Sequence, residues 1–372
     1  MESNKTNSFR DITAGELVAG IKMGWNLGNT FDAHGDRNGF PELECSYAES
    51  SVPDMEAAWV EHVTTRENID AVKAAGFNAI RFPVSWYKAC DADINIRADW
   101  MARVKEVVGF AVDNDMIISV DSHHDETYFS MLDKDLAETK RVFTRMWEQI
   151  AVAFRDYNEK LILEGLNEPR TVDAESEWYG TPEEHNNLNI LNQLFIDTVR
   201  KTGSNNEKRI LMIPTIAASS SEISQKALVI PNDIIPDKII VSIHAYEPYE
   251  FALEVGHDRP VGWNKDDPDD TLPITEPLDL AYDLFVSRGI PVIMGEMGAL
   301  NRNNIDSRVK WAEFYTAYAK SKGIPCFWWD PWMTHASYDN DGYWEETFGI
   351  LNRKTSKFDH PGIVEAMLRG TE

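Results

Sequence analysis

Short apolar runs alternate with longer amphipathic segments along most of the chain. The runs are rich in β-branched residues and are apolar at successive positions, which is typical of parallel strands covered on both faces. Eight such strands are predicted, at 22–27, 78–83, 117–122, 161–166, 210–214, 239–244, 291–295 and 325–329.

The segments that follow these runs have the spacing of amphipathic helices. They are predicted at 65–75, 99–114, 137–157, 184–202, 219–228, 277–288, 307–322 and 361–369. Gly76 follows the first of them, where a glycine commonly ends a helix. Eight strand–helix units predict an α/β fold of the (β/α)₈ TIM-barrel type. A doubly wound sheet is the alternative, but it usually carries a glycine-rich phosphate-binding turn, and the sequence has no GxGxxG or Walker motif.

The length of 372 residues would allow two domains of about 150 residues each. No proline- or serine-rich linker, repeat or low-complexity tract marks a boundary between them. We therefore expect one barrel domain over residues 1–372, with residues 1–20 as an N-terminal extension.

The net charge of the protein limits the kinds of partner that it can bind. With 62 acidic and 36 basic residues, the formal net charge is −26, which disfavours nucleic acids and anionic membranes because their phosphates would be repelled. No stretch approaches the roughly 20 apolar residues that span a bilayer. A neutral or cationic partner is favoured.

Aromatic residues change this picture further, because 12 Trp, 12 Tyr and 16 Phe are more rings than a core requires. Long segments follow the first, sixth and eighth strands, at 29–64, 246–276 and 330–360, and such segments build the functional face of a barrel. Among the rings that they carry are Trp59, Tyr246, Tyr249, Phe251, Trp263, Trp332, Tyr338, Tyr343 and Trp344. About half would form packing clusters, and the others would line a cleft for a neutral polyol polymer, whose apolar CH faces stack on aromatic rings.

Two glutamates follow strands at the face where chemistry is expected. Glu168 comes after the fourth strand and Glu296 after the seventh. Glycosidic bond cleavage requires two carboxyl groups, one that protonates the leaving oxygen and one that is ionised. The sequence therefore predicts that these two side chains meet at the barrel mouth.

Other strands end in supporting groups. A buried Arg81 would keep a neighbouring carboxylate ionised, and Tyr246 could donate a hydrogen bond to the same carboxylate. His244 could hold the acid or the substrate, while His123 and Trp329 end the third and eighth strands.

A metal-dependent hydrolase is a second hypothesis, with ligands from Asp121, His123, His124 and Asp125. Adjacent residues on a strand point to opposite faces, so we expect that the two histidines do not bind one ion. No metal and no cofactor is predicted.

Several motifs in order along the chain resemble glycoside hydrolase family 5, the cellulase family of clan A, and most of all its subfamily 4. They are GWNLGNTFD at 24–32, GFNAIRFPVSW at 76–86, EGLNEPR at 164–170, VSIHAY at 241–246 and GEMG at 295–298. The sequence departs from the usual subfamily pattern after the eighth strand, where it reads Trp-Asp-Pro-Trp at 329–332 instead of Trp-Asp-Asn-Gly.

The resemblance implies a retaining endo-β-1,4-glucanase with Glu168 as acid/base and Glu296 as nucleophile. It implies substrate contacts at Asn29, Arg81, His123, His124, Asn167, His244, Tyr246 and Trp329. Asn167 would bind the sugar 2-hydroxyl, and Trp329 would form the floor of the subsite whose sugar reacts.

Cellulose-type chains, mixed-linkage β-glucan and xyloglucan are all open as substrates. A mannanase or xylanase is a lesser alternative, and a non-catalytic carbohydrate-binding barrel is a remote one. Because such polymers are digested outside the cytoplasm, we expect a secreted or periplasmic protein, although residues 1–10 lack the apolar core of a leader. A cytoplasmic oligosaccharidase is the alternative. We expect a monomer.

Overall fold

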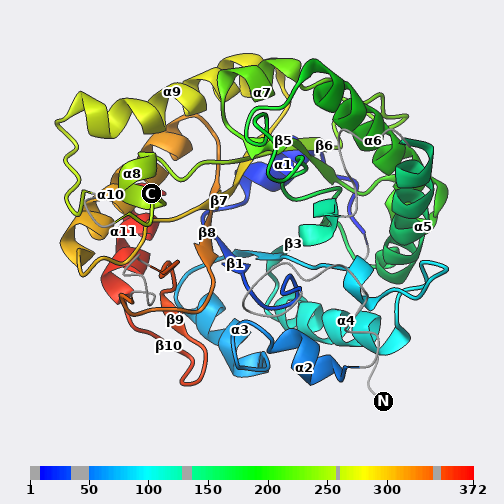
Figure 1. The fold of residues 1–372 in the computed structure, drawn as a ribbon, viewed down its shortest axis with the longest axis horizontal. Coiled ribbons are helices and arrows are strands. Elements are labelled where there is room, and N and C mark those ends of the chain that lie inside the picture. The colour runs from blue at the N-terminus through cyan, green and yellow to red at the C-terminus, as the bar shows by residue number, and fades with distance from the viewer. Residues whose placement is uncertain (1–8, 35–49, 128–135, 257–259, 338–344) are drawn as a thin grey trace.

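Eight parallel strands pair in chain order and close into a barrel in the computed structural model, which describes residues 9–34, 50–127, 136–256, 260–337 and 345–372. Figure 1 looks down this barrel, with the helices forming a ring outside the strands. Closure comes from β1 and β8, which pair in parallel with Gly24 opposite Phe327. The predicted (β/α)₈ TIM barrel is confirmed.

All eight predicted strands form. Their bounds are β1 Gly24–Leu27, β2 Ala79–Phe82, β3 Ile117–Asp121, β4 Leu161–Glu164, β5 Leu211–Ser219, β6 Ile239–His244, β7 Val292–Met297 and β8 Cys326–Asp330. The predicted end of β5 at residue 214 was wrong. A register shift after Pro214, with left-handed backbone at Ala217 and Ala218, lets the strand continue until Ser219 pairs with His244.

The helices around the barrel match most predicted segments. The bounds are α1 Ala14–Ala19, α2 Val52–Glu56, α3 Arg66–Ala74, α4 Ala98–Asp113, α5 Leu136–Phe154, α6 Pro182–Lys201, α7 Glu222–Ala227, α8 Tyr249–Ala252, α9 Pro268–Leu284, α10 Ile305–Ser321 and α11 Pro361–Gly370. A two-stranded antiparallel sheet, β9 Leu351–Asn352 with β10 Lys357–Phe358, lies beside them.

Local sequence explains where these helices start and end. Thr181 and Glu184 form a reciprocal capping box at the start of α6. Gly76 has φ +111° just beyond α3, as the sequence predicted for a helix end. The predicted start of α9 at Pro277 was wrong, because the helix begins nine residues earlier at Pro268, where Asp267 caps it, and Pro277 lies within it.

The two ends of the barrel interior differ in chemistry. At the N-terminal end the interior is apolar, and Leu17 and Ile21 from the region of α1 pack against Ile240 and Phe327. Gly24 makes room for this packing, since a Cβ there would lie 2.2 Å from the Phe327 ring. The N-terminal extension therefore contributes a helix that closes this end of the barrel.

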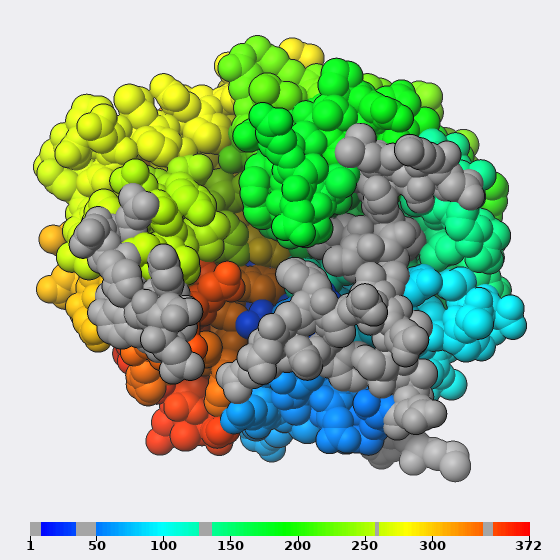
Figure 2. Space-filling view, in the orientation of Figure 1, coloured from blue at the N-terminus to red at the C-terminus, as the bar shows by residue number. Residues whose placement is uncertain are grey.

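The opposite end carries the loops that follow the strands. Figure 2 looks onto this face and shows a hollow near its centre, between segments of the green and orange parts of the chain. Arg353 fixes two of the surrounding loops by donating to the carbonyl oxygens of Gly28 and Asp330. Among the described helices, none is both long and apolar enough to span a membrane.

Candidate active site

Glu168 and Glu296 meet at the mouth of the barrel. Glu296 lies within β7, Glu168 lies four residues beyond the end of β4, and His244 ends β6 between them. The Nδ1 atom of His244 is 2.8 Å from Glu168 Oε1 and 3.8 Å from Glu296 Oε1. One carboxylate oxygen of each glutamate and a nitrogen of His244 lie within 4.8 Å of one another. The expected meeting of the two side chains is thus present.

Glu296 is held on both of its oxygens. Arg81 Nη1 donates to Oε1 at 2.8 Å, and the Tyr246 hydroxyl donates to Oε2 at 2.7 Å. Burial, and then the negative charges of Glu296 and Glu168, raise the pKa of Tyr246 well above its usual range, so the hydroxyl remains a donor. Gly295 leaves the space that His244 occupies, because a Cβ there would lie 2.8 Å from the imidazole Nε2.

Arg81 connects several strands through one buried guanidinium. Its Nε atom donates to Glu164 at 2.6 Å, and Nη2 lies 2.7 Å from both Asn167 Oδ1 and Asp121 Oδ2. Burial alone would lower the pKa of Arg81, but Glu164, Asp121 and Glu296 raise it above its already high value. The cation is therefore permanent, and it orients both Glu296 and Asn167.

The carboxylates around Arg81 outnumber the positive charge. Burial raises the pKa of Asp121 well above its usual range, and the neighbouring Glu164 raises it further, although Arg81 opposes both effects. Asp121 Oδ2 also contacts His123 Nδ1 at 2.8 Å. Burial, followed by the nearby cationic groups, lowers the pKa of His123 well below its usual value, so this imidazole is neutral.

His123 and Trp329 form one wall of the site. Their rings are parallel within 2°, with centroids 5.6 Å apart. Trp328 instead faces the surrounding helices, where its ring meets Trp311 edge-on and its Nε1 donates to the Phe348 carbonyl. Of the adjacent tryptophans, the structure therefore brings Trp329 to the site and Trp328 to the core.

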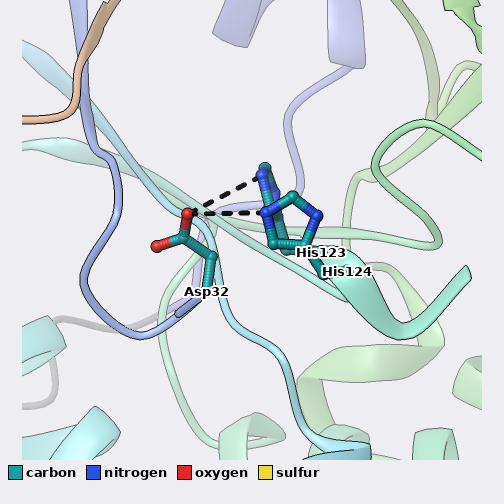
Figure 3. Close-up of side chains that lie close together, drawn as sticks. All are labelled: Asp32, His123 and His124. Atoms are coloured by element: carbon teal, nitrogen blue, oxygen red, sulfur yellow. Dashed lines mark ion pairs between the residues drawn. The ribbon is translucent and has the colours of Figure 1, made fainter. Parts of the chain in front are cut away.

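Both neighbouring histidines approach one carboxylate, contrary to the alternation expected from the sequence. Figure 3 shows Asp32 with His123 and His124, whose Nε2 atoms lie 4.0 and 3.9 Å from Asp32 Oδ2. The alternation argument was wrong because β3 already ends at Asp121 and His124 begins a 3₁₀ turn, His124–Thr127.

Two of the four residues of the metal hypothesis, His123 and His124, share Asp32 as a neighbour, and His123 also contacts Asp121. Asp125 accepts hydrogen bonds from the backbone N–H groups of Trp86 and Tyr87 and from the Ser122 hydroxyl. Asp121 pairs with Arg81, while the two histidines face Asp32. The arrangement builds a wall beside the two glutamates.

The aromatic residues of the three long segments fall into two groups, those near the site and those in packing clusters. Trp59 lies beside His34 and His124, with ring centroids 5.2 and 5.7 Å away. Trp263 is buried against Phe314 and belongs to a packing cluster. Tyr338, Tyr343 and Trp344 lie outside the described residues.

Sequence reasoning missed one residue that links Arg81 to β7. Asn26, within β1, accepts a hydrogen bond from Arg81 and donates one to the Gly295 carbonyl. Asn29 lies in the loop after β1 with φ +56°, and its role as a substrate contact stays a prediction.

This fold and pair of glutamates define a class, the barrel glycoside hydrolases. A family model described as cellulase (glycosyl hydrolase family 5) matches residues 36–335, and the chain belongs to that family. The resemblance expected from the motifs is confirmed.

Relatives of known name agree with this membership. The chain is 40% identical to the cellulase/esterase CelE of Acetivibrio thermocellus over 97% of its own length, but it spans only 41% of that protein. A GH5-4 broad specificity endoglucanase from Ruminococcus champanellensis with bound cellotriose is 40% identical, with a TM-score of 0.87 over 97% of this chain and 100% of that one. A glycoside hydrolase 5 lichenase from Caldicellulosiruptor sp. F32, a mutant in complex with cellotetraose, is 36% identical, with a TM-score of 0.88 over 100% and 99% of the two chains.

Proposed function

We propose that this protein is a retaining endo-β-1,4-glucanase in which Glu168 is the acid/base and Glu296 the nucleophile. The observation that carries the proposal is the approach of the two carboxylates within 4.8 Å. Retaining glycosidases place their carboxyl groups about 5–5.5 Å apart, whereas inverting enzymes need about 6.5–9.5 Å to admit a water molecule between them.

In the first step, Glu168 gives its proton to the glycosidic oxygen while a Glu296 oxygen attacks the anomeric carbon. The bond from that carbon to the leaving oxygen breaks, and a glycosyl ester of Glu296 forms. Arg81 and Tyr246 orient the attacking carboxylate, and they favour its ionised form because both donate hydrogen bonds to it.

In the second step, the Glu168 carboxylate takes a proton from water as the water oxygen attacks the anomeric carbon. The ester bond to Glu296 breaks, and Glu168 is left protonated for the next cycle. Asn167, whose Oδ1 is fixed by Arg81, would keep its amide N–H groups directed toward the sugar 2-hydroxyl.

We further propose neutral β-glucans as substrates, with cellulose-type and mixed-linkage chains first. The net charge of −26 suits an uncharged polymer, and Trp329 with His123 offers a ring wall for a sugar face. Similarity to an endoglucanase that holds cellotriose and to a lichenase that holds cellotetraose supports the same substrate class.

The catalytic assignment is tested by two isosteric variants. Glu296→Gln should lower kcat by more than about 10⁴-fold, because no covalent ester forms. Glu168→Gln should lower hydrolysis of glucan by about 10²–10⁴-fold but spare kcat/KM on a dinitrophenyl cellobioside, whose leaving group needs no proton. The kcat on that substrate should still fall, because the second step loses its base. Mass spectrometry after reaction with a 2-fluoro cellobiosyl donor should find the sugar on Glu296.

Wild-type turnover by either variant, or a label elsewhere, would overturn the assignment. The anomer formed first, read by NMR, should be β, and an α product would contradict retention. Release of reducing ends from cellulose, lichenan, xyloglucan, mannan and xylan then ranks the substrates. Highest activity on mannan or xylan would overturn the β-glucan proposal.

We also propose that the enzyme works as a monomer in the secreted or periplasmic space. The support for this location is the size of the polymers, which do not cross a membrane intact. Sedimentation of the purified chain and fractionation of the native host test the two statements separately.

A further inference from the structure

Three side chains with metal-binding atoms converge in the wall beside the two glutamates, and we call them the wall cluster: Asp32, His123 and His124. The Nε2 atoms of the two histidines lie 4.0 and 3.9 Å from Asp32 Oδ2. One donor atom of each residue lies within 4.8 Å of the others. Figure 3 shows that both imidazole rings approach the same carboxylate oxygen.

These separations fit a shared ion better than direct hydrogen bonds. A hydrogen bond between N and O spans about 2.7–3.2 Å. Two ligands about 2.1 Å from one tetrahedral zinc ion lie about 3.4 Å apart, and a wider angle at the ion increases that separation. A shift of about 0.5 Å would therefore bring the observed pairs to tetrahedral ligand spacing. His124 is free of the strand, in a 3₁₀ turn, and its side chain is 24% exposed, so its ring has room to turn.

His123 is already oriented as a ligand. Its Nδ1 atom lies 2.8 Å from Asp121 Oδ2. Asp121 Oδ1 accepts from the Val84 backbone N–H, and Oδ2 lies 2.7 Å from Arg81 Nη2, so Asp121 meets the imidazole as an acceptor. We therefore assign the ring proton to Nδ1, which leaves the lone pair on Nε2, the atom nearest Asp32. A carboxylate on the second nitrogen is the usual arrangement of a metal-binding histidine, because it fixes the ring.

The carboxylate of Asp32 is fixed in place and lacks a close permanent cation. It is completely buried, and its two oxygens accept backbone N–H groups of Thr30 at 2.6 Å and Asn29 at 3.0 Å. Its ion-pair partners among the described residues are the two histidines, with no Lys or Arg. The ammonium of Lys88 acts on it at longer range and donates to the Ala33 carbonyl. Buried carboxylates are normally paired or bind a metal, and a divalent ion would supply the missing charge.

The donor atoms indicate which kind of ion would bind. Two imidazole nitrogens and one carboxylate oxygen suit zinc and the neighbouring divalent transition metals. Calcium and magnesium prefer oxygen ligands, so the wall cluster selects against them. Three protein ligands also leave one position of a tetrahedral zinc ion open to water.

A second group of donor atoms lies nearby but is already engaged. Glu168, His244 and Glu296 also place one donor atom each within 4.8 Å of the others. There, Arg81 and Tyr246 donate to the two oxygens of Glu296, and His244 Nδ1 lies 2.8 Å from Glu168. An ion would have to displace these hydrogen bonds, whereas in the wall cluster the histidine nitrogens lie beyond hydrogen-bond distance from the carboxylate.

We propose that Asp32, His123 and His124 form an inhibitory site for a divalent transition-metal ion of the zinc type. The ring of His123 lies parallel to Trp329, and both histidines are expected contacts of the sugar. An ion bound to them takes their nitrogen atoms from the sugar hydroxyls and occupies space beside the cleft. The double displacement by Glu168 and Glu296 uses carboxyl groups alone, so the ion opposes the reaction. The inhibition rests on the proposed function, but binding of the ion does not.

The first test measures binding without any need for activity. Titration calorimetry of metal-free protein with ZnCl₂ should give one site with a dissociation constant in the micromolar range or below. His124→Gln should weaken binding by at least about 100-fold, because loss of a ligand costs more than loss of an outer-shell partner. The matched control is His335→Gln. His335 Nε2 also lies 3.9 Å from a carboxylate oxygen, that of Asp359, but its side chain is 81% exposed. This variant should bind zinc and hydrolyse glucan as the wild type does.

The second test locates the ion. Anomalous diffraction at the zinc edge, from crystals soaked in ZnCl₂, should place a peak about 2.0–2.2 Å from one donor atom of each wall-cluster residue. This measurement needs no variant, so it decides the matter even if His124→Gln does not fold. Glu168→Gln should keep wild-type affinity. Absence of zinc binding, a peak among Glu168, His244 and Glu296, or loss of binding in Glu168→Gln would overturn the proposal.

The third test measures the consequence for catalysis. Zinc should raise KM for a soluble mixed-linkage glucan with little change in kcat, at concentrations that match the dissociation constant, and EDTA should reverse the effect. His124→Gln should need at least about 100-fold more zinc for the same fractional inhibition. Unchanged hydrolysis by zinc-saturated enzyme, or a loss of activity on chelation, would overturn the inhibitory role. A wild type that binds zinc at the wall cluster but cleaves no glucan would contradict the proposed function and leave the metal site standing.

Discussion

Two fully buried arginines, one at each end of the barrel, solve the problem of a buried cation in different ways. Arg81, in β2 at the catalytic end, pairs with the carboxylates of Asp121, Glu164 and Glu296. Arg209, just before β5 at the other end, donates to backbone carbonyls, including those of Phe154 and Leu161. Both side chains are completely buried.

The pKa values show what each set of partners does. Burial, followed by the nearby Arg200, lowers the pKa of Arg209 to about 9, since neutral carbonyls return little of the lost hydration. The carboxylates around Arg81 raise its pKa despite equal burial. The backbone carbonyls around Arg209 only accept hydrogen bonds, whereas the carboxylates around Arg81 can also exchange protons or attack carbon. The comparison separates a cation that stabilises loops from one that prepares a reactive group.

The largest expected effect is that of removing charge at the catalytic end. Arg81→Met leaves three carboxylates buried beside one another and should destabilise the fold by about 3–5 kcal/mol. It should also reduce kcat/KM by more than about 10³-fold, because Glu296 and Asn167 lose their common partner. Urea unfolding and glucan hydrolysis measure the two losses. Arg81→Lys is the control, and its single ammonium should recover stability better than activity.

The same substitution at the opposite end should separate stability from catalysis. Arg209→Met leaves several buried carbonyls without a donor, so we expect a loss of about 3 kcal/mol in unfolding free energy. Below the unfolding transition, kcat/KM should stay within about twofold of the wild type, since no catalytic group touches Arg209. A loss of activity as large as that of Arg81→Met would end the distinction between the two arginines.

Two tyrosine hydroxyls, one at the site and one in the core, give a finer version of the comparison. Tyr246→Phe removes the donor to Glu296 and should lower kcat/KM by about 10–100-fold, the equivalent of one hydrogen bond to a charged group. Tyr315 donates to the carbonyl of neighbouring Ala245 instead. Tyr315→Phe should therefore cost stability, about 1–3 kcal/mol, with little change in kcat. Equal kinetic effects of the two variants would contradict this assignment.

The smallest effect is expected at the surface of the N-terminal end. Hydrogen bonds from Lys208 and Lys238 lower the pKa of Asp11 from 3.8 to about 2. Because the folded pKa is depressed, the stability from this pairing is present above about pH 4 and is lost as pH falls toward 2. Asp11→Asn should thus unfold more easily than the wild type at pH 6 and equally at pH 2, with unchanged hydrolysis. A difference that persists at pH 2 would assign the effect to packing.

Sequence alone determined the fold and predicted which two glutamates would meet at its mouth. The alternation of apolar runs and amphipathic segments reflects which faces of each strand and helix are buried. This pattern can be read from neighbouring residues in the sequence, so it predicts the secondary structure without coordinates. Because parallel strands end at one face of a barrel, residues that follow strands converge there, and Glu168 and Glu296 could be chosen without coordinates. The end of β5 and the start of α9 were missed, since a bulge and a capping aspartate overrode the prolines nearby.

Only the tertiary structure decided which neighbours surround the two glutamates. Trp328 and Trp329 are indistinguishable by position in sequence, and the barrel register sends one to the core and the other to His123. Asn26 lies in one of the family motifs, but its role was not predicted, because that role comes from contacts with residues on other strands. Pairing energies and pKa shifts depend on distances of a few ångströms between such segments, and a linear pattern does not contain those distances.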